Sequence, residues 1–470
     1  MNTLKISTET RLQLDTFIRQ FMRENTIPGV SIGIIQDGKI VYTKGYGYRD
    51  LENSLPMTPD TLFGIGSITK SFTAFAIMKL VEDQKIHLDD SVSIHLQKEP
   101  FLSNPDITIG HILSHSSGLP STDASMIETW YKYGKFDKIY PIASEDDFFD
   151  HIAAVKSFIV HKPGEIMLYN NDLYECLGLI IEKISKKPYS QYIQDLLLSQ
   201  LGMTRATFSK DAILQDSMSN YVTPYLKVEG DKKDTLKEIE FPHHWLFTAS
   251  GGLFASINDM LKYIQFMLNT GSIGERQVIS SDNFSTLWKP RISEPDGFTP
   301  NAKYALGWAL DEKYMDHTVI YHGGHIDFNC ASVIMVPNKN IGVIVGQNSC
   351  NSSASIIGRY ILALLLDKLP EKVIPELKFK NLLKLLIGTY ISPLGLYKLE
   401  IALKDQILWA VIEYDDGIIH APLIMDDENG LSFSLCLAQH PPYSKIKFIT
   451  NTTNDLVEFV HYDRYIYKKK

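Results

Sequence analysis

The stretch Thr61-Leu-Phe-Gly-Ile-Gly-Ser-Ile-Thr-Lys-Ser-Phe-Thr-Ala-Phe-Ala-Ile-Met-Lys-Leu80 decides the fold of this chain. Two glycines end an extended segment, and a helical pattern follows from Ser67 to about Asp83. We expect Ser67 to open this helix, where unpaired backbone N–H groups and the helix dipole favour an alkoxide. Lys70 lies one turn further on, so both side chains share one face. A desolvated lysine amine can accept the hydroxyl proton, so the two residues form a candidate nucleophile and base.

Other interpretations of this stretch are also compatible with its sequence. Ser67 suits a helix N-cap, and Ser444-Lys-Ile-Lys447 repeats the Ser-x-x-Lys spacing, as chance alone allows. The stretch also approaches the phosphate loop G-x-x-x-x-G-K-S, but Thr69 stands where the second glycine is needed. Its Cβ would block the backbone from a phosphate, so nucleotide binding is disfavoured.

Length and composition limit the class of protein. A chain of 470 residues with 44% hydrophobic and 21% charged content predicts two or three folded domains. The net charge of −9, spread without long blocks, argues against nucleic acid as a partner. No apolar run reaches membrane-spanning length and the start does not resemble a signal peptide, so we expect no membrane insertion and a cytoplasmic location.

Cysteines and histidines give no metal or cofactor signature. The four cysteines lack metal or redox spacing. His111 and His115 have the i, i+4 spacing of a zinc helix, but H-E-x-x-H needs glutamate where this chain has Ile112. We therefore interpret both histidines as packing or capping residues and predict no metal and no cofactor.

The order of predicted elements indicates an α+β fold. A helix over Thr8–Asn25 precedes two strands joined by an Asp37-Gly38 turn, and a long, mostly helical middle follows. Late strands are expected at Tyr304–Leu310, Thr318–Tyr321, Ala331–Val336 and Ile341–Gly346, before a closing helix at Ile356–Leu366. We expect an antiparallel sheet flanked by helices, in which early and late strands meet, with an inserted all-α lobe and Ser67 in the cleft between them.

Three motifs stand in order along the chain: Ser67-x-x-Lys70, Tyr169-x-Asn171 and His322-Gly-Gly324. This set resembles the class C β-lactamase and D-alanyl-D-alanine carboxypeptidase group of serine hydrolases, whose signature is S-x-x-K, Y-x-N and [KH]-x-G. The flanking stretches HILSHSSGLP, PGEIMLYNND, LLLSQLGMTRATF and SGGLFASINDM resemble that group as well. The resemblance extends over about residues 10–365 and implies a β-lactamase and penicillin-binding-protein-like fold.

The resemblance also implies roles for individual residues. Ser67 is expected to attack a carbonyl and form an acyl-enzyme, while Lys70 and Tyr169 transfer the proton; which of the two is the base stays open. Asn171 is expected to bind the substrate amide. The oxyanion would lie between the backbone N–H groups of Ser67 and His325.

His322 stands where β-lactamases of the group usually carry lysine, and imidazole is charged only when acidified. We therefore expect a small ester or a D-amino-acid-containing peptide amide as substrate. Gly323 and Gly324 would let the strand approach it closely. The alternatives are a true β-lactamase or DD-carboxypeptidase, and a catalytically silent penicillin-binding-type scaffold or sensor.

The character of the sequence changes near its end. We expect a hydrolase domain over residues 1–366, a linker over 367–386 carrying two prolines, and a small all-β domain over 387–470. Short strands at regular spacing, with Asp-Gly and Asn-Gly turns, predict an antiparallel barrel in that last domain. It resembles the lipocalin-like barrel appended to some peptidases of the group, which implies a role in access to the cleft or in oligomer assembly.

Overall fold

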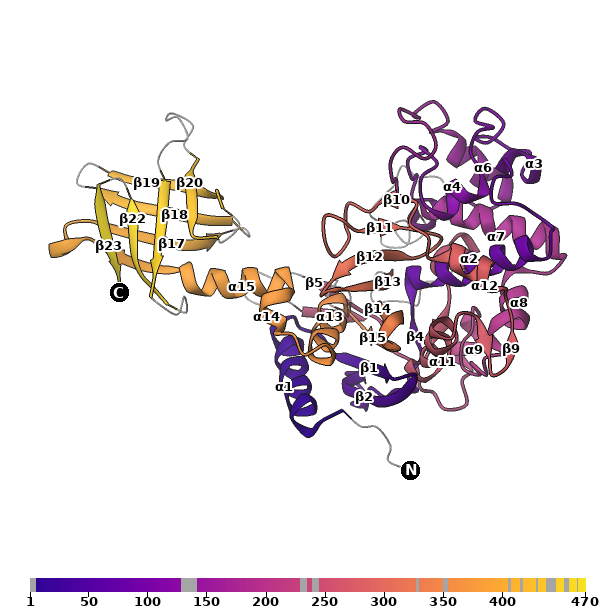
Figure 1. The fold of residues 1–470 in the computed structure, drawn as a ribbon, viewed down its shortest axis with the longest axis horizontal. Coiled ribbons are helices and arrows are strands. Elements are labelled where there is room, and N and C mark those ends of the chain that lie inside the picture. Colours follow the sequence, from indigo (N-terminus) through magenta and orange to yellow (C-terminus); the bar gives the residue numbers. More distant parts are fainter. Residues whose placement is uncertain are drawn as a thin grey trace. The chain divides into compact units, whose positions relative to one another are not determined.

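A nine-stranded antiparallel sheet frames the larger part of the chain (Figure 1). Its strand order is β10-β11-β12-β13-β14-β15-β1-β2-β3, so β1 (Gly29–Gln36) pairs with β15 (Ile341–Gln347). The other strands are β2 Lys39–Asp50, β3 Leu55–Pro56, β10 Ile292–Ser293, β11 Lys303–Tyr304, β12 Ala309–Tyr314, β13 His317–Ile326 and β14 Asn329–Val336. The expected meeting of early and late strands is confirmed.

The computed structural model describes residues 6–127, 142–228, 235–238, 245–326, 329–349, 354–404, 407–414, 417–427, 430–436, 445–451, 456–462 and 464–470. Part of the long middle that was expected to be mostly helical, together with Cys350, lies outside these ranges. The chain divides into two units, Met1–Asp367 and Lys368–Lys470. Within the described residues, no helix has the length and apolar character needed to cross a bilayer.

Helices cover both faces of the sheet, so its central strands are buried on both sides. A Cβ on Gly342 would touch α11, whereas Ile334, which pairs with Val343 and so points to the opposite face, touches α13. The α-helices among the described residues of this unit are α1 Thr8–Glu24, α2 Thr69–Glu82, α3 Val92–His95, α4 Ile109–Leu113, α6 Glu145–Ala153, α7 Asn171–Ser185, α8 Tyr189–Ile193, α9 Lys210–Leu214, α10 Thr248–Gly251, α11 Ile257–Leu268, α12 Ser281–Leu287 and α13 Ala354–Leu365.

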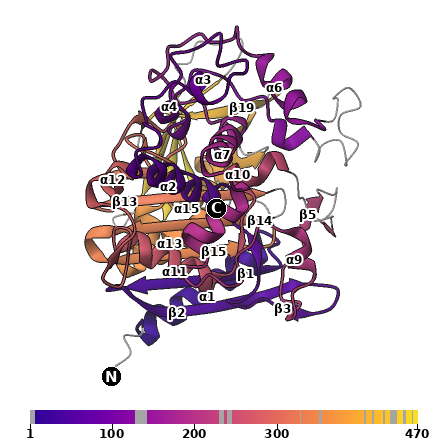
Figure 2. The same ribbon diagram turned by 90° about the vertical axis from the view of Figure 1, so that its right-hand side faces the viewer.

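Helix α2 lies at the centre of the unit, beside α7 and α10 (Figure 2). Ten consecutive residues, Thr69–Met78, are buried, as expected for a helix that is apolar on nearly every side. The helix begins at Thr69 rather than Ser67, which lies in a preceding 3-10 turn, Gly66–Ile68. No side chain caps α2, so the N-cap interpretation of Ser67 is wrong.

The second unit is a closed eight-stranded antiparallel barrel preceded by two helices, α14 Pro370–Val373 and α15 Pro375–Leu386. Its strands are β16 Gly388–Ile391, β17 Lys398–Lys404, β18 Ile407–Tyr414, β19 Gly417–Met425, β20 Ser432–Leu435, β21 Lys445–Thr450, β22 Val457–Tyr462 and β23 Tyr465–Lys469. The barrel closes because β16 pairs with β23. The expected α+β fold with a C-terminal barrel is confirmed, and the stretch expected as a linker is largely helical.

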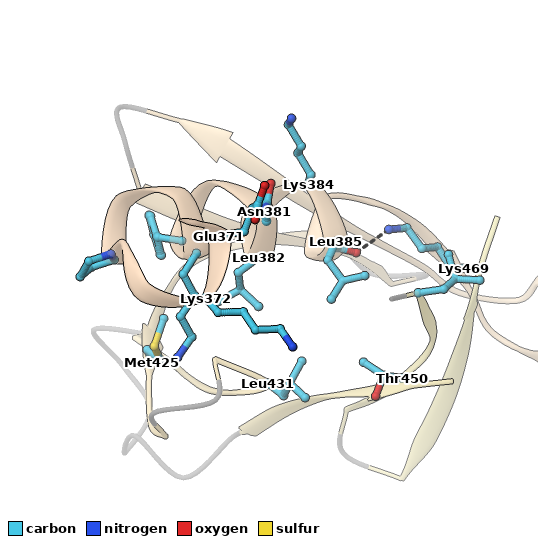
Figure 3. Close-up of a pocket in the computed structure, with 14 residues that line it drawn as sticks. Glu371, Lys372, Asn381, Leu382, Lys384, Leu385, Met425, Leu431, Thr450 and Lys469 are labelled. Carbon is cyan, nitrogen blue, oxygen red and sulfur yellow. Dashed lines mark hydrogen bonds between the residues drawn. The ribbon is translucent and has the colours of Figure 1, made fainter. Parts of the chain in front are cut away.

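Helix α15 packs its leucines against the barrel core and borders a pocket of about 1060 Å³ (Figure 3). The Nζ atom of Lys469 lies at this pocket and donates to the carbonyl oxygen of Leu385 at 2.6 Å. Apolar and lysine side chains dominate the lining, and none of the candidate catalytic residues contributes to it. The candidate site therefore lies in the first unit.

Candidate active site

Ser67 and Lys70 lie within hydrogen-bond distance, with 3.1 Å between the serine Oγ and the lysine Nζ. The same Nζ donates to Asn171 Oδ1 at 2.6 Å and to the carbonyl oxygen of Ser250 at 2.8 Å. The Lys70 side chain is fully buried, and this desolvation lowers its pKa to about 7. The amine can therefore lose its proton near neutral pH and accept one from Ser67.

A buried carboxyl group, Glu175 on α7, lies close to this lysine and was not singled out in the sequence. Its two oxygens accept from the backbone N–H groups of Ala249 and Ser250 at 3.0 and 2.7 Å. Burial raises the pKa of Glu175 to about 7, and its charge acts against the lowering of the Lys70 pKa. Glu175 thus holds the backbone that offers the Ser250 carbonyl to Lys70. In the sequence, the feature that could have pointed to Glu175 is a glutamate placed among apolar neighbours in a predicted helix.

Tyr169 stands at the end of the extended segment that leads into α7. Tyr169 lines a cavity and is 40% exposed, and the Lys70 Nζ lies 4.9 Å from its ring centroid. Desolvation of the phenol raises the pKa of Tyr169, and its hydrogen bond with Ser67 partly opposes that rise. The hydroxyl is therefore protonated at neutral pH and lies beside the candidate nucleophile.

The two asparagines after Tyr169 make different contacts. Asn170, not Asn171, caps α7, because its Oδ1 accepts from the backbone N–H of Leu173 at 3.1 Å. Asn171 is the first helical residue, and its Oδ1 accepts from Lys70. The structure thus ties Asn171 to the candidate base, and its expected contact with a substrate amide stays a prediction.

His322 on β13 is only 6% exposed, and both ring nitrogens have partners. Nε2 lies 2.8 Å from the Tyr304 hydroxyl, and Nδ1 lies 2.6 Å from the carbonyl oxygen of Gly323, to which only a protonated nitrogen can donate. Burial, with a contribution from the Lys70 charge, lowers the pKa of His322 to about 4. The imidazole is therefore neutral at physiological pH and provides no fixed positive charge.

Close backbone packing places the Ser67 turn against β13. Gly66 has φ +54°, and a Cβ there would come within 2.5 Å of the His325 backbone nitrogen. A Cβ on Gly324 would overlap the carbonyl oxygen of Ile65, whereas one on Gly323 would meet nothing within 4 Å. Gly324 therefore serves the packing of the turn, and this packing brings Ser67 near the backbone nitrogen of His325.

A cavity of about 510 Å³ joins most of the candidate residues. Its lining includes Ser67, Tyr169, His322, Gly323, Gly324 and His325. Lys70 and Asn171 are not in the lining, and they reach Ser67 from the buried side. Two acidic residues that the sequence did not point to, Glu294 and Asp296, also line the cavity. Burial raises the pKa of Glu294 to about 7, and its Oε2 accepts from the Tyr321 hydroxyl at 3.0 Å.

The two histidines with zinc-helix spacing lie in different settings, one on α4 and one in the turn after it. His111 completes a capping box with Thr108 at the start of the helix. His115 lies against Tyr169, with 4.0 Å between ring centroids. Among the described residues, no group of three or more His, Cys, Asp or Glu side chains is arranged to hold a metal ion.

Comparison with protein families places this geometry in context. The sequence model of a family described as Beta-lactamase matches residues 14–366. The chain belongs to the beta-lactamase family. Protein flp of Staphylococcus aureus (strain MW2), a relative, is 30% identical over 349 residues, which is 73% of this chain and 64% of flp. The unguisins hydrolase ungD' of Aspergillus campestris is 26% identical over 381 residues, which is 77% of this chain and 66% of that protein. The chain thus spans less than two thirds of the length of flp.

Solved structures agree with the family membership. The octameric penicillin-binding protein homologue from Pyrococcus abyssi superposes with a TM-score of 0.84 at 31% identity, over 97% of this chain and 99% of the homologue. The class C β-lactamase from Rhodobacter sphaeroides gives a TM-score of 0.59 at 20% identity, over 75% of this chain and 99% of the lactamase. The resemblance inferred from the motifs is confirmed: this beta-lactamase family member has the fold of class C β-lactamases and penicillin-binding proteins.

Proposed function

We propose that this protein is a serine hydrolase that forms an acyl-enzyme through Ser67. The observation that carries the proposal is the 3.1 Å contact between Ser67 Oγ and a buried lysine whose pKa lies near 7. Neutral Lys70 takes the hydroxyl proton while Oγ forms a bond to the substrate carbonyl carbon. The negative charge on the carbonyl oxygen is received by the backbone N–H groups of Ser67 and His325.

Tyr169 completes the proton transfer in this scheme. Because its pKa is raised, the phenol is a poor initial base but can donate a proton to the leaving group. Lys70, with its lower pKa, is the better first acceptor, and its ammonium group then supplies the proton that restores the Tyr169 phenol. A water molecule then attacks the ester between Ser67 and the acyl group, and the same residues act in reverse.

The charges around the cavity support neutral or amine-bearing esters and D-amino-acid peptide amides as substrates. His322 is neutral, so it offers a substrate carboxylate no fixed cation. Glu294 and Asp296 line the same cavity and repel such a carboxylate when ionised. These features disfavour the alternative of a true β-lactamase or DD-carboxypeptidase, whose substrates carry a carboxylate.

Fluorophosphonate labelling followed by intact-protein mass spectrometry tests the proposal. The wild-type protein should gain one covalent adduct, and Ser67→Ala should gain none. Ser444→Ala is the matched control, because it removes the serine of the second Ser-x-x-Lys sequence and should label normally. A folded wild-type protein that takes up no label would instead support the silent scaffold or sensor.

We also propose that the protein assembles into oligomers through its C-terminal unit. The support is the similarity to the Pyrococcus abyssi homologue, which is described as octameric and is matched over 99% of its length. Light scattering should give a mass several times that of the 53.3 kDa chain. A monomer at all micromolar concentrations would contradict this proposal.

A further inference from the structure

His115 holds the backbone on both sides of Tyr169 through two hydrogen bonds. The backbone N–H of Leu168 donates to the carbonyl oxygen of His115 at 2.8 Å. The backbone N–H of Asn170 donates to Nδ1 of the same histidine at 3.1 Å. One residue thus restrains the backbone on both sides of the tyrosine, from which the phenol extends.

The imidazole of His115 also supports the phenol ring itself. The two ring centroids are 4.0 Å apart, with 34° between the planes. On its other sides the imidazole contacts Tyr174 at 4.9 Å and Tyr304 at 5.0 Å between centroids, and Tyr304 in turn bonds to His322. His115 is therefore the packing centre between the Tyr169 segment and the His322 strand.

Several features argue against an ordinary core residue at this position. His115 is only 1% exposed and adopts φ +55°, a left-handed conformation that is unfavourable for most side chains. Its Nε2 has no hydrogen-bond partner among the residues that the structure describes. An unpaired buried polar atom costs stability, so an apolar residue would suit packing alone better.

The protonation state of His115 fits its contacts. Burial, together with the nearby Lys70 and His322, keeps the pKa of His115 well below its usual range, so the ring is neutral. Because Nδ1 accepts from Asn170, the single ring proton lies on Nε2. The neutral ring adds no positive charge beside Lys70, so it leaves the candidate base free to lose its proton.

We infer that His115 is a positioning residue that aims the Tyr169 hydroxyl at Ser67 through its carbonyl oxygen, its Nδ1 atom and its ring face. This inference rests on the proposed function, in which Tyr169 transfers the proton. A small misplacement of a group that acts in the chemical step lowers the rate strongly, while binding of the substrate changes little. His115 therefore acts on kcat through Tyr169.

Two substitutions at His115 distinguish the contribution of its Nδ1 acceptor atom from that of side-chain volume. His115→Asn keeps an acceptor where Nδ1 lies and tolerates a left-handed backbone, whereas His115→Leu has no acceptor. With a short-chain nitrophenyl ester, His115→Leu should lower kcat about tenfold or more, with KM changed less than about threefold. His115→Asn should recover part of that loss. His111→Asn is the matched control, because His111 caps the start of α4, the short helix before His115, and the kcat of this variant should stay near wild type.

A double-mutant cycle with Tyr169→Phe shows whether His115 acts through the phenol. Once the hydroxyl is gone, either substitution at His115 should lower kcat by less than about threefold further. If the His115 substitutions lower kcat equally with and without the Tyr169 hydroxyl, His115 is only a packing residue. The same holds if His115→Asn is no more active than His115→Leu. If Tyr169→Phe alone turns over normally, the proposed role of Tyr169 fails and the inference fails with it. If Tyr169→Phe is slow but both His115 variants are fully active, only the inference fails.

Discussion

The Tyr304 hydroxyl lies 2.8 Å from Nε2 of His322 and, with the Gly323 carbonyl oxygen on Nδ1, fixes the neutral tautomer of that imidazole. Nδ1 donates to the carbonyl, so Nε2 is left to accept from the phenol. A second proton on Nε2 would reverse that hydrogen bond, with the phenol oxygen as acceptor. This arrangement removes a positive charge from the strand edge at which class C β-lactamases usually carry lysine.

Replacing His322 tests the resulting substrate preference. The wild-type protein should hydrolyse nitrocefin poorly compared with a short-chain nitrophenyl ester or a D-alanyl anilide. His322→Lys should raise kcat/KM for nitrocefin by roughly tenfold or more, because a charge-assisted hydrogen bond to the carboxylate becomes available. Equal wild-type rates on nitrocefin and the ester, or no gain in the lysine variant, would show that His322 does not decide the substrate class.

The pH dependence of turnover should follow Lys70. Its amine must be neutral to accept the Ser67 proton, so kcat/KM should rise with pH through about 7 and then level off. The carboxyl groups of Glu175 and Asp172 hold the pKa of Lys70 up, while His115 and His322 are neutral in this range.

The Glu175→Gln substitution tests in which direction the Glu175 charge shifts the pKa of Lys70. Without the Glu175 charge the ammonium form of Lys70 is less stable, so the pKa of Lys70 falls and the rising limb moves to lower pH. The exposed Glu275 is the matched control, and Glu275→Gln should leave the profile in place. If the rising limb of the kcat/KM profile stays fixed or moves to higher pH in Glu175→Gln, the titration of Lys70 does not set that profile.

The two glycines of the third motif should respond differently to alanine. Gly324→Ala places a Cβ against the Ile65 carbonyl oxygen, so the backbone must shift and the thermal midpoint should fall by several degrees. Gly323→Ala meets nothing within 4 Å and should melt close to wild type. Similar midpoints for both variants, measured by circular dichroism, would contradict the close packing of the Ser67 turn on β13.

Glu294 should contribute to selection by substrate charge. Its ionised form disfavours an anionic group in the cavity, so Glu294→Gln should raise kcat/KM for a carboxylate-bearing ester several-fold relative to a neutral ester. Because burial raises the pKa of Glu294 to about 7, the difference should shrink below that pH, where the wild-type group is protonated. An unchanged ratio between the two esters at pH 8 would exclude Glu294 from this role.

Much of the fold followed from local patterns. The Asp37-Gly38 turn predicted the early hairpin of the sheet, and short strands at regular spacing, with Asp-Gly and Asn-Gly turns, predicted the barrel. The stretch expected as a linker, residues 367–386, is largely helical, since Pro375 begins the helix α15 rather than breaking one. A proline at the first helical position and a proline in a loop look alike in sequence.

The sequence by itself determined that Ser67 and Lys70 meet, because three residues in a helical turn bring side chains together whatever surrounds them. Tertiary structure decided the rest of the candidate site. The helix begins at Thr69, Asn171 turns to Lys70, and His322 stays neutral through contacts made with distant segments. Glu175 and Glu294 gain raised pKa values only because folding buries them, and burial is a property of the assembled chain rather than of any short stretch of letters.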